Sequence, residues 1–147
     1  MKNILKKSIC EKDGTKVFYN YIKKNLELPT LVFIHGWVMN YTAWEDTRKA
    51  LSSQGYSTLT FDIRGHGKSV SKNVSFTKVV NDIKSIIIKE NIERIVIIGY
   101  SMGGMIAQKY YAKYSDKVKA IILVNTTYIN PLRKLPLSNM RLMKYLT

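Results

Sequence analysis

Cysteine is almost absent from this 147-residue sequence: Cys10 stands alone, which excludes an internal disulfide framework. A catalytic role for this cysteine is unsupported, because the sequence offers no second thiol or other partner near it. Long apolar runs are also missing, and residues 1–10 contain lysines but no continuous apolar segment. We therefore expect no signal peptide and no transmembrane segment, and we expect a cytoplasmic location.

Acidic residues are few, with 10 Asp and Glu against 24 Lys and Arg, and the formal net charge is +14. A basic surface can bind nucleic acid by releasing counterions from phosphates. Here, however, the lysines are scattered among isoleucines and asparagines, without an arginine-rich stripe or a recognised nucleic-acid motif. We expect no nucleic-acid partner. The length and a hydrophobic content of 46% instead predict one globular core.

Short apolar runs alternate with segments of helical periodicity along most of the chain. The strand patterns cover residues 4–10, 15–22, 30–34, 57–62, 93–98 and 118–124, and the helical patterns cover 41–53, 76–87 and 105–114. Strands that alternate with helices form parallel sheets through right-handed crossovers. The sequence therefore predicts an α/β fold with a mostly parallel sheet and helices on both faces.

One short motif carries most of the chemical information: Gly99-Tyr100-Ser101-Met102-Gly103-Gly104, between a predicted strand and a predicted helix. A serine with glycine two residues away on each side is typical of a nucleophile elbow. The turn is tight and strained, so the flanking residues must be small. The hydroxyl then stands clear of the backbone at a helix start, where free N–H groups can stabilise an oxyanion.

Two further motifs precede the elbow, and together the three resemble the N-terminal half of an α/β-hydrolase. His35-Gly36-Trp37 follows a strand, as in the loop behind the third strand of that family. The run from Asp62 to Ser69 resembles the loop behind its fourth strand. The likeness extends from about residue 16 to about residue 126. Because complete relatives are about twice as long, it implies an α/β-hydrolase fold truncated after the sixth strand.

The resemblance implies a division of the chain and a set of site residues. Residues 1–128 would form the N-terminal part of the core, and residues 129–147 the start of a cap or lid; the alternatives for the latter are a frayed tail and a short membrane-surface helix. Ser101 would be the nucleophile, and the N–H groups of Trp37 and Met102 would form the oxyanion hole. Neither a metal nor an organic cofactor is expected. The residues expected to support the site structurally are His35, Gly36, Gly99, Gly103, Asp62 and His66.

The acid and the histidine of a triad follow the serine in this family. Here Asp116 is the only acidic residue after Ser101, and no histidine follows it. His35 and His66 precede the serine, at positions where the family uses histidine to support a loop. Asp116 is expected at the wrong end of the sheet, and a carboxamide at residue 125 cannot replace a carboxylate beside an imidazolium. The sequence thus predicts a nucleophile without its general base.

These observations favour a serine hydrolase of carboxylic esters or related acyl substrates, present as an N-terminal part that is inactive alone. The motifs resemble methyl-ester carboxylesterases of the biotin pathway as well as lysophospholipase-like and peroxidase-like relatives, so the small-molecule ester stays open. One alternative is a catalytically silent binding protein. Another is one half of a split hydrolase, whose partner would be a C-terminal half polypeptide.

Overall fold

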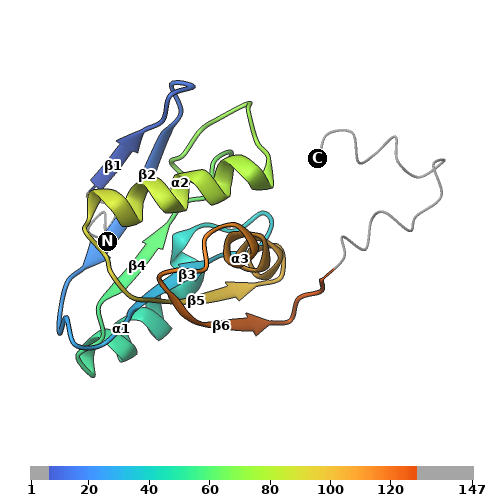
Figure 1. Cartoon of the computed structure of the whole chain (residues 1–147). Coiled ribbons are helices and arrows are strands. Elements are labelled where there is room, and N and C mark those ends of the chain that lie inside the picture. The colour runs from blue at the N-terminus through green and yellow to red at the C-terminus, as the bar shows by residue number, and fades with distance from the viewer. Residues whose placement is uncertain (1–6, 129–147) are drawn as a thin grey trace.

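A computed structural model describes residues 7–128 of the chain, and these residues form one six-stranded sheet with helices packed on it (Figure 1). The strands are β1 (Lys7–Cys10), β2 (Lys16–Ile22), β3 (Thr30–Ile34), β4 (Thr58–Phe61), β5 (Ile95–Tyr100) and β6 (Val118–Val124). Their spatial order is β1-β2-β4-β3-β5-β6. The first two pairings, β1 with β2 and β2 with β4, are antiparallel, and the remaining three are parallel. The predicted mostly parallel α/β sheet is confirmed.

Helices cover both faces of the sheet, as the sequence predicts. The helices α2 (Phe76–Lys89) and α3 (Met102–Lys113) pack on one face, where apolar side chains of β2 to β5 form the main core. On the other face, α1 (Glu45–Ser53) and the 3-10 helix η1 (Tyr41–Trp44) cover a smaller cluster built on Leu31, Phe33 and Ile98. β3 is buried along its whole length, as expected for a strand enclosed by two helical layers.

Several predicted elements differ from the observed ones in extent. The expected helix over residues 41–53 is η1 followed by α1, because the Asn40 side chain accepts the Thr42 N–H and caps a short 3-10 turn first. β5 continues through Tyr100, and α3 begins at Met102 instead of residue 105. The strand therefore leads directly into the helix, and Ser101 is the single residue between them.

β6 is the last strand of the sheet within residues 7–128, and its outer edge pairs with no described strand. Ile122, Leu123 and Val124 are 48%, 43% and 37% exposed. The expected cap, tail or membrane-surface helix over residues 129–147 lies outside the described residues. Among the helices formed by residues 7–128, none has the length and apolar character required to cross a bilayer.

Candidate active site

Ser101 lies at the carboxyl end of β5, the edge where open α/β sheets place their sites. Its backbone has φ 51 and ψ -117, a conformation that residues with a side chain rarely adopt. The serine is also the N-cap of α3, although its side chain makes no capping hydrogen bond. The strained backbone leaves the hydroxyl available at the helix N-terminus, which is the arrangement that a nucleophile requires.

Gly99 and Gly103 are needed at the elbow for close approach. A Cβ on Gly99 would collide with the Gly103 carbonyl, so any side chain there would separate β5 from the start of α3. A Cβ on Gly103 would collide with the carbonyl oxygens of Ile34 and His35 at the end of β3. The absence of a side chain at Gly103 therefore allows the start of α3 to pack closely against the loop that begins at residue 35. The two halves of the candidate oxyanion hole meet through this contact.

Met102 and Trp37 are the residues whose N–H groups were predicted to form this oxyanion hole. Met102 is the first residue of α3, and a helix leaves its first N–H groups without an intrahelical acceptor. Trp37 follows Gly36 in the loop behind β3, and the residue is 39% exposed. A Cβ on Gly36 would lie 3.0 Å from the Tyr100 ring, so this loop packs on the residue just before the serine.

His35 is buried, and hydrogen bonds engage both nitrogens of its ring. Nε2 accepts the backbone N–H of Ile63 at 3.0 Å, which leaves Nδ1 to donate to the Gly36 carbonyl at 2.8 Å. This pattern selects the neutral tautomer with its proton on Nδ1. Burial, with a smaller contribution from the nearby His66, lowers the pKa of His35 to about 4, although the hydrogen bond to the Gly36 carbonyl acts in the opposite direction. The ring therefore ties the loop behind β3 to the loop behind β4 and has no free nitrogen for Ser101.

Asp62 and His66 organise the loop behind β4. The two carboxylate oxygens of Asp62 accept the Tyr41 N–H at 2.9 Å and the Lys68 N–H at 2.8 Å. The His66 ring meets the Trp37 indole edge-on, with ring centroids 5.4 Å apart, and its Nδ1 lies 3.4 Å from the Arg64 carbonyl. No hydrogen bond joins either histidine to Ser101 in the part of the chain that the structure describes.

The end of β6 and the segment that follows it hold the elbow from the other side, and sequence reasoning did not assign them this role. The Ser101 N–H donates to the Val124 carbonyl at 3.0 Å, and the Thr126 hydroxyl donates to the Ser101 carbonyl at 2.6 Å. The sequence did contain one signal for this role: Thr126 comes two residues after a predicted strand, at the carboxyl edge of the sheet where the site lies. Asp116 precedes β6 and is therefore at the opposite edge, as predicted, whereas Asn125 directly follows the strand with φ 47.

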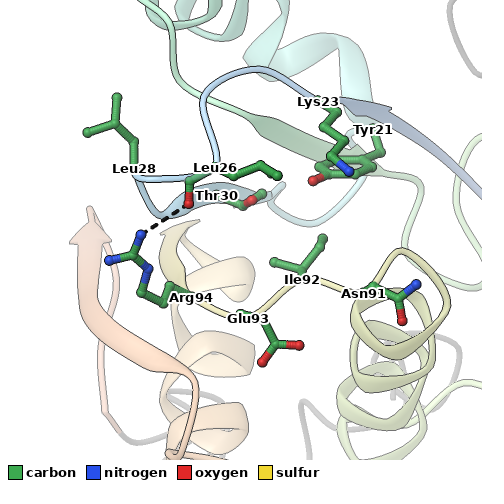
Figure 2. A pocket seen from close by; sticks show the side chains of 9 residues that line it. All are labelled: Tyr21, Lys23, Leu26, Leu28, Thr30, Asn91, Ile92, Glu93 and Arg94. Atoms are coloured by element: carbon green, nitrogen blue, oxygen red, sulfur yellow. Dashed lines mark hydrogen bonds between the residues drawn. The ribbon is translucent and has the colours of Figure 1, made fainter.

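A surface pocket lies where β3 and β5 begin, at the edge opposite Ser101 (Figure 2). One of its walls is the Arg94 side chain, whose guanidinium donates to the Leu26 carbonyl at 3.0 Å. It shares no residue with the elbow or with the loops behind β3 and β4, so it is separate from the candidate active site. Residues 7–128 contain no cluster of three or more His, Cys, Asp or Glu side chains that could hold a metal ion.

Known proteins share both the sequence pattern and the fold. Residues 29–145 match the profile of a family described as alpha/beta hydrolase fold. A non-heme chloroperoxidase of Kitasatospora aureofaciens is 30% identical over 121 residues, which are 80% of this chain and 43% of that protein. The pimeloyl-[acyl-carrier protein] methyl ester esterase of Wigglesworthia glossinidia brevipalpis is 34% identical over 98 residues, 66% of this chain and 36% of that protein.

Among solved structures, an esterase from Exiguobacterium antarcticum superposes with a TM-score of 0.75 at 30% identity. The match covers 82% of this chain and 45% of the esterase. The chain thus spans less than half the length of each of these three relatives. With the family profile matching most of its length and with the sheet order, helix placement and serine turn described above, the chain belongs to the α/β-hydrolase family.

Proposed function

We propose that this chain is the nucleophile-bearing part of a serine hydrolase that acts on carboxylic esters or related acyl substrates. The observation that carries the proposal is the backbone of Ser101, held at φ 51 between β5 and α3. Ser101 Oγ would attack the ester carbonyl and form an acyl-enzyme, which water would then hydrolyse to the acid. The Met102 and Trp37 N–H groups would stabilise the oxyanion of each tetrahedral intermediate.

The proposal places the general base outside residues 7–128. Both nitrogens of His35 are already hydrogen-bonded, its pKa is lowered to about 4, and the ring is 1% exposed. A buried ring with this pattern cannot take a proton from serine without breaking a contact between two loops. The remaining histidine, His66, is packed against Trp37 and is oriented towards the Arg64 carbonyl.

We propose a C-terminal half polypeptide as the source of the base and of the acid that orients it. The outer edge of β6 pairs with no strand of residues 7–128, and this edge, with the exposed Ile122 and Leu123, offers a place for further strands. More than half of the length of each relative named above also lies outside the matched region. A small ester is the proposed substrate, in keeping with the two relatives that are named esterases.

Labelling by a fluorophosphonate probe tests the nucleophile. We expect weak or no labelling of the chain alone, because removal of a triad histidine costs several orders of magnitude in rate. Labelling of Ser101 should rise strongly when the C-terminal half of a relative is co-expressed or fused after Thr147. Ser101→Ala is the control and should abolish the signal in both preparations.

Two results would contradict the proposal. Rapid labelling of the chain alone, together with Ser101-dependent turnover of a short p-nitrophenyl ester, would show that a residue of this chain acts as the base. A well-folded complex that still fails to label would favour the alternative of a catalytically silent binding protein.

A further inference from the structure

The peptide unit between Ser101 and Met102 has a function at each end. Its N–H, on Met102, is the candidate oxyanion donor, and its carbonyl, on Ser101, accepts the Thr126 hydroxyl at 2.6 Å. The same carbonyl also accepts the N–H groups of Gly104 at 2.9 Å and Met105 at 3.4 Å. Because a trans peptide is planar, with its C=O and N–H pointing in opposite directions, groups that fix the carbonyl also fix the direction of the N–H.

Thr126 is held firmly enough to act in this way. It lies directly on Gly104, where an added Cβ would be 2.5 Å from the threonine methyl carbon, so the helix start and the threonine are in close contact. The next residue is also tied to α3, since Gln108 Nε2 donates to the Thr127 carbonyl at 3.1 Å and to the Gly104 carbonyl at 3.2 Å. Two residues before Thr126, the Val124 carbonyl accepts the Ser101 N–H, so the end of β6 is also hydrogen-bonded to the elbow.

We propose that Thr126 is a positioning residue for the oxyanion hole: its hydroxyl orients and polarises the Ser101–Met102 peptide so that the Met102 N–H points at the developing oxyanion. A hydrogen bond to the carbonyl end of a peptide draws electron density from the nitrogen and makes the N–H a stronger donor. The inference rests on the proposed serine hydrolase function, because it concerns the same intermediate.

Two substitutions separate the hydroxyl from the rest of the side chain. Thr126→Val keeps the branched shape against Gly104 and removes the donor, whereas Thr126→Ser keeps the donor and removes the methyl. Thr127→Val is the matched control, since no side-chain hydrogen bond of Thr127 is found within the described range 7–128. Thermal unfolding of all three variants shows whether any of them has lost the fold.

The first measurement does not depend on activity. The chain has six methionines, so selective 15N-methionine labelling of the full chain gives a short amide spectrum, in which Met102→Leu identifies the Met102 signal. Thr126→Val should move the Met102 amide proton upfield, because the peptide is less polarised. Thr126→Ser and Thr127→Val should leave that signal near its native position.

The second measurement uses the chain combined with the C-terminal half of a relative. Thr126→Val should lower kcat for a short p-nitrophenyl ester by about tenfold with little change in KM, a smaller effect than the ~100-fold that follows removal of an oxyanion donor itself. Thr126→Ser should restore most of the native kcat. Equal kcat for the valine variant and the native chain, or a serine variant as impaired as the valine one, would overturn the inference.

The two proposals fail in different ways. If no preparation reacts through Ser101, the serine hydrolase function is wrong, and the Met102 amide signal alone decides whether Thr126 orients the peptide. An unmoved Met102 signal in a folded Thr126→Val variant would overturn the positioning role whatever the activity.

Discussion

The Arg64 guanidinium and the Asp82 carboxylate form a buried two-pronged ion pair, with Nη2···Oδ1 at 2.5 Å and Nε···Oδ2 at 2.7 Å. The side chains are 2% and 1% exposed. The same guanidinium also binds Asp13 Oδ2 at 2.8 Å and the Asn73 carbonyl at 3.0 Å. The loop behind β4, which contains His66, is thereby fixed to α2 and to the turn between β1 and β2.

Breaking this ion pair should destabilise the fold strongly. Asp82→Asn leaves a buried guanidinium without its main counter-charge, and loss of one partner of a buried pair costs about 3–5 kcal/mol. The free energy of unfolding in urea measures the effect. Lys49→Gln is the control, because Lys49 is 59% exposed and its 3.5 Å contact with Glu45 should contribute less than ~1 kcal/mol. A loss in the Asp82 variant no larger than in the Lys49 variant would contradict the prediction.

His35 should make the fold sensitive to acid. Its folded-state pKa, about 4, lies below the unfolded value of 6.5, so between these pH values the unfolded chain binds a proton that the folded chain does not. Stability is therefore complete above about pH 6.5 and falls as the pH drops towards 4, by about 3 kcal/mol in total. Urea unfolding across this range measures the slope.

His35→Gln tests the origin of that slope. A glutamine oxygen can still accept the Ile63 N–H, but the side chain does not titrate, so the pH dependence between 6.5 and 4 should become clearly shallower. An unchanged slope in the His35 variant would show that other groups cause the acid sensitivity.

The strained backbone at Ser101 should lower the free energy of unfolding of any variant that has a side chain at this position. Residues with a side chain at such dihedral angles cost about 1–3 kcal/mol, and glycine avoids this cost at an entropic loss of about 0.5–1 kcal/mol. Ser101→Gly should therefore be more stable than Ser101→Ala by about 1 kcal/mol in thermal or urea unfolding. In the middle of α2 the order should reverse, with Ser85→Gly less stable than Ser85→Ala by about 1 kcal/mol. The same order at both sites would argue against strain at the elbow.

The exposed edge strand should make the isolated chain associate. β6 has an unpaired outer edge among the described residues, and its Ile122 side chain is 48% exposed. Unpaired apolar edges recruit other chains, so sedimentation velocity should show concentration-dependent oligomers. Ile122→Lys should shift the chain towards monomer. Ile88→Lys, at an isoleucine of α2 that is 58% exposed, is the matched control and should leave association unchanged. A monodisperse native chain would contradict the prediction.

Local sequence determined much of the secondary structure and the serine turn. The predicted strands 30–34 and 118–124 are confirmed with the same bounds, because each is a continuous run rich in β-branched and other apolar residues. Ser75 caps α2 by accepting the N–H of Lys78, three residues further along the chain. Glycine spacing around Ser101 identified the elbow, since only residues without a Cβ fit beside the helix start. These features depend on neighbours within a few residues, and the printed sequence contains those neighbours.

Tertiary structure alone decided which distant groups meet. The Thr126 hydroxyl reaches the Ser101 carbonyl across 25 positions, and Arg64 finds Asp82 across 18. The neutral His35 ring links the loops behind β3 and β4 by accepting the N–H of Ile63, which is 28 positions away in the sequence. Its neutral state also depends on burial, which no local sequence pattern reveals. Hydrogen bonds and ion pairs need atoms within about 3 Å and in line, a condition set by how the strands are ordered and how the helices pack on them. The sequence could therefore point to Ser101 as the candidate nucleophile, but only the packed sheet showed which side chains hold that residue in place.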